Sequence, residues 1–366
     1  MKIQTESLRG AIELASKFSE TSTSLDQRYK GIQFKKVGDT KLAIAGSNFN
    51  SYVVISGLEV DSWDGLPSGD HFFVETSVVS KVVGAASNPF VEIDWNEATN
   101  QLEFETGAHY KINYFKSEVS FDPETDLTWK SMTISEVLSA INKLRLFSAE
   151  DTMSLELSGV YFGKGYAYGF NGFEGIRVSN VPDSIDACFS TDPFSALSKM
   201  DATVSIEVAV SPNRIYFRQG SILVAGLLFS KNYPHAQIDD MLTESQSSEG
   251  QHFGLRSGEI KQAIIRGSLF AKESSKIAEL RYKDVYNLTI SVVDVENNQR
   301  VQQNLMLQEG HTVKPDFAIR LGLDFLGHVL QVCEQDTLID FVFSNGIVWV
   351  GKDKLVTFSS VRRSEA

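Results

Sequence analysis

Two distant stretches of this chain share one pattern of alternating apolar and polar residues. The stretch Gly159–Ser179, GVYFGKGYAYGFNGFEGIRVS, alternates apolar residues with small or polar ones around glycine-rich turns. The stretch Gly31–Ser56, GIQFKKVGDTKLAIAGSNFNSYVVIS, follows the same pattern and begins 128 residues earlier. Alternation with a period of two predicts β-strands, and the short polar turns predict hairpins. A repeat of this size predicts a fold made of equivalent blocks and not one built around a single active site.

Short strands of this kind fill most of the chain, and six segments with helical periodicity interrupt them. The strands include KLAIAGSNF, FVEIDW, QLEFET, VSIEVAV, RIYFRQG, NLTISVVDV, LIDFVFS and GIVWVG. The helices are expected at Ser7–Glu20, Thr76–Ala86, Ser135–Phe147, a short segment opening at Asp192 and Pro193, Ser257–Phe270, and from Asp324 to Cys333. Ser135 and Asp324 are expected to cap their helices. The order helix, hairpin, helix, hairpin then recurs three times.

Two acidic connectors that contain proline separate the recurring units. They are Ser120–Met132 and Asn232–Gln251. The predicted fold class is α+β, with three tandem modules that each pack two helices on antiparallel sheets. The modules are expected at residues 1–122, 130–235 and 250–366. The paired carboxylates Asp239 and Asp240 fall in the second connector, where solvation is the expected state.

The distribution of charge separates the helices from the rest of the chain. The 366 residues carry a formal net charge of −13, which opposes general binding to the phosphates of nucleic acid. The acidic residues concentrate in connectors and turns, whereas the polar faces of several helices are basic. These faces carry Arg9, Lys17, Lys81, Lys143, Arg145, Lys199, Lys261, Arg266 and Lys272. An acidic protein of this kind can present positive charge in one place, although solvated helix faces are the simpler interpretation.

The sequence contains no signal for catalysis, for a metal site or for a cofactor. Two cysteines, Cys188 and Cys333, and six histidines leave little for a disulfide framework or a zinc site. No GxSxG, Walker A, HExxH or GxGxxG motif lies between a strand and a helix. The charged N-terminus does not resemble a signal peptide, and no apolar run is long enough for a membrane span. We therefore expect a cytoplasmic protein that is not an enzyme.

In its order and spacing the whole chain resembles the bacterial beta sliding clamp, the ring-shaped processivity factor of the replicative DNA polymerase. LRGAIELASKF, the first hairpin stretch and HFFVETSVVSKVV are similar to the first domain of this family. FSAEDTMSLELSGVYF and SKNYPHAQIDDML are similar to landmarks of the second domain, and DFLGHVLQVCEQDTLIDFVFSNG to the third. The family has no short catalytic signature, so the resemblance depends on order and spacing.

The resemblance implies a homodimeric ring, closed head to tail, that encircles double-stranded DNA and tethers the polymerase (the DNA polymerase III beta subunit of bacteria). The basic helix faces would then line the hole and contact phosphates without reading bases. Tyr110 of the first module would meet Leu269 and Phe270 of the third at the dimer interface. Sequence-independent DNA contact and replication partners in the cytoplasm follow from the same resemblance.

The resemblance also implies a pocket that captures short linear peptides of DNA polymerases and of the clamp loader. The matching positions are Leu157, Phe170, Gly172, Phe173, Ile176, Val178, Pro234, Ile238, Val356, Phe358, Ser360 and Val361. The family's Thr-Asp-Gly-His-Arg-Leu type of loop is replaced here by FNGFEGIRV, and its Met-Pro-Met-Arg-Leu ending by FSSVRRSEA. Such divergence fits a clamp with its own set of partners, as in a phage or a mobile element.

Two other classes of protein stay open at this level. One is a non-catalytic scaffold or structural protein of repeated β-rich modules, whose helices are buried in some other way. The other is an unrelated sugar- or peptide-binding β protein. Positive charge aligned along all the helices would favour the clamp over both.

Overall fold

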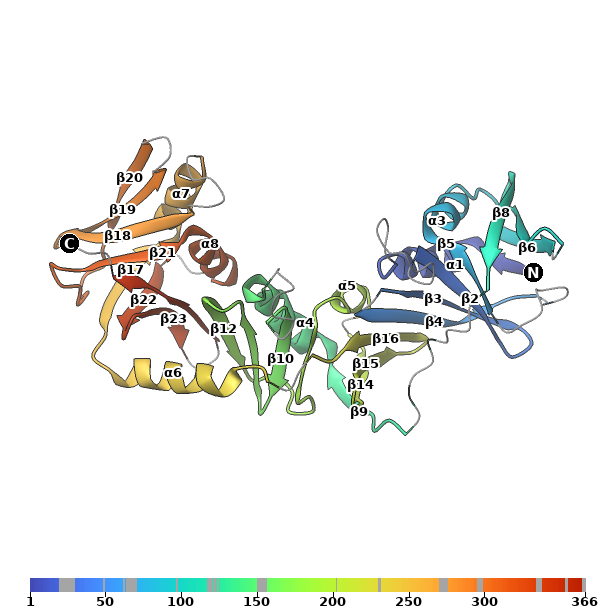
Figure 1. The fold of residues 1–366 in the computed structure, drawn as a ribbon, viewed down its shortest axis with the longest axis horizontal. Coiled ribbons are helices and arrows are strands. Elements are labelled where there is room, and N and C mark those ends of the chain that lie inside the picture. Colours follow the sequence, from blue (N-terminus) through green and yellow to red (C-terminus); the bar gives the residue numbers. More distant parts are fainter. Residues whose placement is uncertain are drawn as a thin grey trace. The chain divides into compact units, whose positions relative to one another are not determined.

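The computed structural model describes residues 1–19, 30–48, 50–61, 63, 71–96, 98–116, 121, 124, 126–149, 157–201, 203–229, 232–269, 276–294, 299–333, 338–352 and 355–363 (Figure 1). The chain divides into two compact units. The first comprises Met1–Leu138 and Phe189–Phe229, and the second Ser139–Cys188 and Ser230–Ala366.

The element order repeats one motif six times: a short strand, a helix and a three-stranded meander. The leading strands are β1 (Lys2–Gln4), β5 (His71–Glu75), β9 (Lys130–Thr133), β13 (Ala187–Ser190), β17 (Gln251–Arg256) and β21 (Ala318–Gly322). The helices are α1 (Thr5–Ser16), α3 (Thr76–Gly84), α4 (Ile134–Leu144), α5 (Phe194–Leu197), α7 (Ser257–Ser268) and α8 (Leu323–Val332).

The six meanders follow their helices at corresponding places. The first, third and fifth are β2 (Gly31–Val37), β3 (Lys41–Ser47) and β4 (Ser51–Glu59); β10 (Gly159–Gly163), β11 (Tyr166–Phe170) and β12 (Glu174–Ser179); and β18 (Ile277–Asp284), β19 (Asn287–Asp294) and β20 (Gln299–Met306). The second, fourth and sixth are β6 (Phe90–Asn96), β7 (Gln101–Glu105) and β8 (His109–Phe115); β14 (Ser205–Val210), β15 (Arg214–Gln219) and β16 (Ile222–Leu227); and β22 (Leu338–Ser344), β23 (Ile347–Lys352) and β24 (Leu355–Ser360). The two stretches that repeat in the sequence are therefore the first and third meanders, which confirms the predicted α+β duplication.

Neighbouring repeats exchange their leading strands. β1 pairs with β6 of the second repeat, while β5 of the second repeat pairs with β2 of the first. The fifth and sixth repeats do the same through β17 with β22 and β21 with β18. Because each repeat completes the sheet of its neighbour, two repeats form one interlocked block, as the predicted doubling within each module requires.

Sheets also continue across the predicted module boundaries. β4 pairs with β16 in a 12-stranded sheet, and β12 pairs with β24 in an 8-stranded sheet. A 5-stranded sheet has the order β20-β19-β18-β21-β25, with β25 at Arg362–Arg363. These continuous hydrogen-bond ladders explain why the two compact units do not coincide with three modules, and the division into three modules stays a prediction.

The helices lie close to their predicted places, with shifted ends. α1 starts at Thr5 and buries Leu8, Ala11, Ile12 and Ala15, as the apolar spacing predicts. The predicted caps were wrong, because α4 already begins at Ile134 and the N-cap of α8 is Gly322. A 3₁₀ turn (Arg145–Phe147) completes the third predicted helix.

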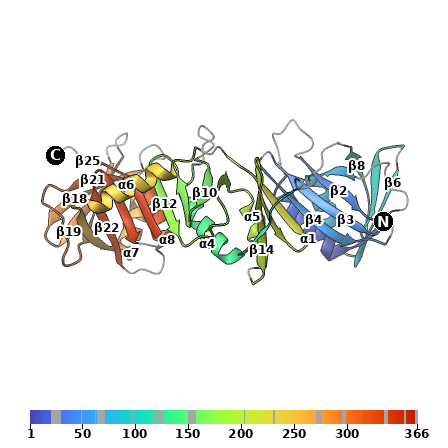
Figure 2. The ribbon, with the colours of Figure 1, turned by 90° about the horizontal axis from the view of Figure 1, so that it is seen from below.

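A helix that was not predicted, α6 (His235–Ser247), occupies most of the second connector. Its buried residues Ile238, Leu242 and Ser245 follow one face at helical spacing. α6 crosses one face of the 8-stranded sheet, and α8 lies on the other (Figures 1 and 2). This helix therefore belongs to the packed structure of the second unit.

Glycine allows the helices to approach the middle strands of the meanders. An added Cβ on Gly46 in β3 would lie 2.1 Å from the carbonyl oxygen of Ala15 in α1, and one on Gly169 in β11 would lie 2.3 Å from that of Leu144 in α4. In the fifth repeat the glycine is on the helix, where a Cβ on Gly267 would lie 2.9 Å from Cγ2 of Val292 in β19. A glycine on either the strand or the helix therefore allows the same close approach between them.

We predict that Gly46→Ala lowers the free energy of unfolding by at least about 2 kcal/mol, because the new methyl group overlaps a backbone oxygen that cannot rotate away. Urea unfolding followed by circular dichroism measures the change. Gly10→Ala in α1 is the matched control, because its Cβ meets nothing within 4 Å. The control should be neutral or gain about 0.5–1 kcal/mol, and an equal loss in both variants would contradict the packing argument.

Candidate partner-binding site

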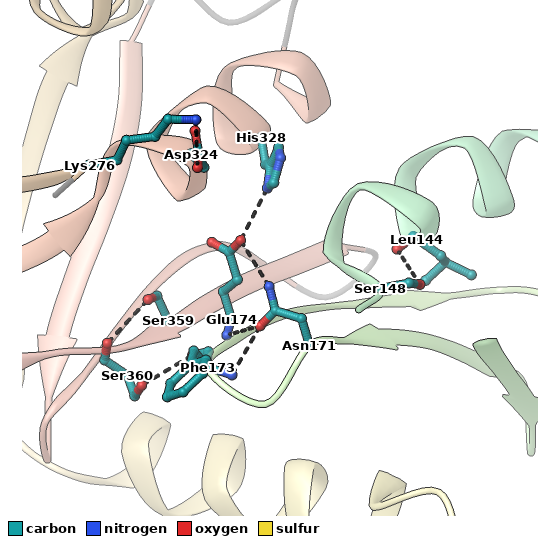
Figure 3. A network of polar contacts seen from close by, with 10 residues as sticks. All are labelled: Leu144, Ser148, Asn171, Phe173, Glu174, Lys276, Asp324, His328, Ser359 and Ser360. Carbon is teal, nitrogen blue, oxygen red and sulfur yellow. Dashed lines mark hydrogen bonds and ion pairs between the residues drawn. The ribbon is translucent and has the colours of Figure 1, made fainter. Parts of the chain in front are cut away.

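The turn between β11 and β12 is ordered by its own asparagine (Figure 3). The Asn171 side-chain oxygen accepts hydrogen bonds from the backbone amides of Phe173 and Glu174, each at 3.0 Å. Gly172 has φ +100°, a conformation that favours glycine. The turn holds the Phe173 side chain in solvent, where 75% of it is exposed.

The same turn is tied to α8 by a buried carboxylate. Glu174 is 9% exposed, accepts a hydrogen bond from Asn171 Nδ2 at 3.2 Å, and lies 3.3 Å from His328 Nδ1 (Figure 3). The His328 ring packs edge-on against Phe147, with 5.2 Å between ring centroids. The Asn-Gly pair at 171–172 is a turn signal that the sequence shows, whereas the contact between Glu174 and His328 depends on the fold.

The strand register gathers several of the predicted pocket residues on the face that α6 covers. Phe170 lies opposite Gly175, and Gly175 lies opposite Phe358. The Phe170 and Phe358 rings are 5.9 Å apart. A Cβ on Gly175 would lie 2.5 Å from the Phe358 ring, so the absence of a side chain at Gly175 leaves space for the Phe170 and Phe358 rings. Val356 and Ser360 alternate with Phe358 on the same face.

Other predicted pocket residues lie elsewhere around the turn. Ile176 is fully buried, and the alternation of β12 directs it and Val178 to the face opposite Gly175. Leu157 lies beside Gly172, whose added Cβ would be 3.9 Å from it. The backbone amide of Val361 donates to Gly346 at 2.9 Å. The register therefore places Ile176 and Val178 on the other face of the sheet from Phe170 and Phe358.

α6 is fixed to this sheet by Asp239. Its carboxylate accepts a hydrogen bond from the Tyr168 hydroxyl at 2.7 Å and forms an ion pair with Arg177 at 3.0 Å. Burial, together with the hydrogen bond to Asp239, raises the pKa of the Tyr168 hydroxyl. The expectation that Asp239 is solvated was therefore wrong, because Tyr168 and Arg177 lie opposite each other and point toward the same carboxylate.

Aromatic stacking anchors the start of α6. The His235 ring stacks on Tyr161 at 4.3 Å, and Tyr233 stacks on Tyr161 at 5.6 Å. Pro234 precedes the helix, and its carbonyl oxygen accepts a hydrogen bond from the backbone N–H of Ile238. Ile238 is 3% exposed. Anchored in this way, α6 lies on the face of the sheet that carries Phe358, which is 1% exposed, and Phe170, which is half-buried. The half-buried Phe170 and the exposed Phe173 offer apolar surface beside the helix, of a kind that suits the apolar side chains of a short peptide.

The described residues contain no group of three or more His, Cys, Asp or Glu side chains that could hold a metal ion. Within the same ranges, no helix is both long and apolar enough to cross a membrane.

The cations predicted to face DNA differ in their surroundings. The exposed ones on or just after helices are Lys17, Lys81, Arg145, Lys199, Lys261 and Arg266. Lys143 is half-buried, and the Arg9 guanidinium donates to Glu6 and to the Ala86 carbonyl, which ties α1 to the end of α3. Arg266 donates to Gln303 in β20 at 2.9 Å. Lys272 lies outside the described residues.

The residues predicted at the dimer interface lie on β8 and at the end of α7. Tyr110 is half-buried in β8, and Leu269, just after α7, is 77% exposed. Phe270 lies outside the described residues. This interface stays a prediction.

Six strand–helix–meander repeats with exchanged leading strands define a protein of the clamp class of α+β folds, and known structures bear this out. The chain matches a DNA polymerase sliding clamp from Caulobacter crescentus with a TM-score of 0.83, 14% identity and 99% of each chain covered. It matches the DNA polymerase sliding clamp from Bacillus subtilis with a TM-score of 0.80, 15% identity and 100% and 99% covered. A DnaN sliding clamp from Bartonella birtlesii, solved bound to griselimycin, matches with a TM-score of 0.83, 11% identity and the same coverage.

The chain therefore has the fold of the bacterial DNA polymerase III beta sliding clamps over its whole length. No protein-family model and no curated protein sequence matches it. The resemblance inferred from order and spacing is confirmed at the level of the fold.

We predict that Tyr168→Phe lowers the free energy of unfolding by about 1–2 kcal/mol, because Asp239 loses a buried donor. The pKa of Tyr168 is raised in the folded state, so its contribution is complete below the unfolded value of about 10 and is lost as the pH rises above it. The difference between wild type and variant should therefore shrink in alkali, as thermal unfolding across pH would measure.

Tyr166→Phe is the matched control for this prediction. It makes the same change on the same strand, at a side chain that is 36% exposed. A comparable loss in the control, or a difference that grows above pH 10, would count against the role of the Tyr168–Asp239 bond.

Proposed function

We propose that this protein is a DNA sliding clamp, a non-catalytic ring that encircles duplex DNA and tethers a replicative polymerase. The observation that carries this proposal is the clamp fold itself, retained over the whole chain at 11–15% identity to solved clamps. DNA polymerase and clamp loader would be its protein partners, in the cytoplasm.

Exposed cations on the helices support the contact with DNA. Lys17, Lys81, Arg145, Lys199 and Lys261 each follow or belong to a different helix of the repeat series. Each exposed cation near phosphate contributes about 1 kcal/mol or less, and none reads a base. Weak, sequence-independent contacts of this kind allow sliding, while closure of the ring provides retention.

The pairing of the meander edges supports a head-to-tail dimer. The last strand of the first repeat, β4, pairs with the last strand of the fourth, β16, and β12 of the third pairs with β24 of the sixth. Continuing this rule, β20 of the fifth repeat would pair with β8 of the second repeat in another chain. Among the described strands, β20 has only β19 beside it, and β8 meets β5 only at Tyr114 and Phe115. Open edges of this kind favour pairing between chains.

The surface around Phe170 and Phe358 supports the partner-peptide pocket. The Bartonella birtlesii clamp was solved with griselimycin and the Borrelia burgdorferi protein with a natural product, so the fold accommodates small ligands. By extension, we assign peptide capture here to the Phe170–Phe358 surface, Ile238, Pro234 and the exposed Phe173. The altered turn and C-terminal strand would give it its own peptide preference.

Retention on circular DNA tests the proposed function. Protein at high concentration is incubated with a nicked plasmid, so that rings open and close around it, and is passed through a sizing column at high salt. The proposal predicts coelution with the circle and release once the plasmid is cut to a linear form. Equal retention on circular and linear DNA would indicate ordinary binding and contradict a sliding ring.

We predict that Leu269→Asp shifts the protein from dimer to monomer without loss of thermal stability, because this side chain packs little in the free chain and a carboxylate would be buried at the interface. Analytical ultracentrifugation measures the assembly. Phe173→Asp, which changes an equally exposed residue at the peptide pocket, is the control and should stay dimeric. A wild-type monomer at micromolar concentration, or a dimer in both variants, would contradict the interface.

A further inference from the structure

A groove of about 410 Å³ lies between α6 and the turn that joins β22 to β23. Its lining includes the apolar residues Met241 and Ile347, the carboxylates Asp240 and Glu244, and the polar residues Ser245 and Asn345. None of these residues belongs to the predicted peptide pocket. Apolar and charged side chains are both available in it to a bound chain.

The groove continues the proposed peptide pocket. In the sheet, Ile347 lies directly opposite Ser360, which borders that pocket. On α6, Met241 follows Ile238 by three residues, which places it one turn further along the helix. A peptide held beside the exposed Ser360 and extending along α6 would therefore reach the groove.

The acidic residues of α6 divide into a neutralised one and two unpaired ones. Asp239 is held by Tyr168 and Arg177. Asp240 and Glu244 are exposed, and neither carboxylate has an ion-pair partner within the part of the chain that the structure describes. Like charges four residues apart repel along a helix by about 0.2–0.5 kcal/mol, and carboxylates toward its C-terminus oppose the helix dipole. These two residues therefore do not stabilise α6 and are free to attract a cation.

A buried hydroxyl gives an independent sign that the groove receives a ligand. Ser245 is 1% exposed and lines the groove, and its Oγ has no hydrogen-bond partner among the described residues. A serine within a helix commonly donates to the carbonyl four residues before it, so an unbonded Oγ is unusual. A polar atom of a bound chain would satisfy it.

We propose that this groove binds a basic flank of the partner peptide, in which Lys or Arg next to the apolar motif pairs with Asp240 and Glu244. The inference rests on the proposed peptide pocket and adds a charge preference to it. The anchored α6 fixes the two carboxylates in advance, so the peptide meets a preformed acidic border. Nucleic acid is not an occupant of this surface, because phosphate would be repelled by the same carboxylates.

The experiment uses three fluorescein-labelled peptides that share one short apolar core of Leu and Phe residues and carry Lys-Lys, Ser-Ser or Glu-Glu at both ends. Binding to the full-length protein is followed by fluorescence anisotropy at low and high salt. Two exposed ion pairs should make the Lys peptide bind roughly threefold to tenfold more tightly than the Ser peptide at low salt, and high salt should remove the difference. The Glu peptide should bind most weakly.

The double variant Asp240→Asn with Glu244→Gln should bind the three peptides with nearly equal affinity and should unfold at an equal or higher temperature, because repulsion within α6 is removed. Glu136→Gln with Asp316→Asn, which makes the same change in net charge at exposed residues that do not line the groove, should keep the Lys preference. Ser245→Ala should weaken all three peptides roughly fivefold at unchanged thermal stability.

The outcomes separate the inference from the function on which it depends. Equal affinity of the three peptides for the wild type, or a Lys preference that survives in the double variant, overturns the basic flank and leaves the pocket in place. Binding of none of the three peptides overturns the pocket and the inference together. A preference lost equally in the Glu136 and Asp316 control would reduce the effect to net charge and also overturn the inference.

Discussion

The structure depends on backbone hydrogen bonding along the edges of its three-stranded meanders. A three-stranded meander has two edges with unpaired N–H and C=O groups, and each repeat here covers one edge of its neighbour with its leading strand. The other edges pair with more distant meanders, as β4 does with β16 and β12 with β24. Because hydrogen-bond ladders run through successive repeats, the chain builds long sheets out of small units. Among the described meander strands, β20 has no neighbour on its outer edge, and β8 meets β5 only at Tyr114 and Phe115.

Packing between helix and sheet explains how this chain shares its fold with solved clamps although few residues are identical. In the first, third and fifth repeats the helix approaches the middle strand of the meander closely, and Gly46, Gly169 and, from the helix, Gly267 make room for this contact. The requirement is for the absence of a side chain at one contact and not for a particular sequence around it. A fold defined by alternation, strand exchange and close approach can therefore match solved clamps at 11–15% identity while no family model matches the sequence.

The sequence was sufficient for the repeat, the strands and most of the helices, because these follow from local periodicity. Prediction from the sequence failed where contacts between residues distant in the chain determine the structure. α6 was taken as a connector because its acidic residues and flanking proline hid the spacing of Ile238 and Leu242. Asp239 was predicted to be solvated because Tyr168 and Arg177, which are 71 and 62 residues away in the sequence, contact it only in the fold. The pocket residues were placed by resemblance, and only the strand register shows that Ile176 and Phe358 point to opposite faces.

The unpaired edges of β8 and β20 connect the architecture to the proposed ring, so amide hydrogen exchange in these two strands tests the account most directly. The account predicts that the amides pointing away from β7 and β19 exchange slowly at high protein concentration. It also predicts that they become fast together on dilution, as the chains separate. If these amides exchanged rapidly at every concentration while the strands beside them stayed protected, the two edges would not pair between chains, and the ring would have no basis in this fold.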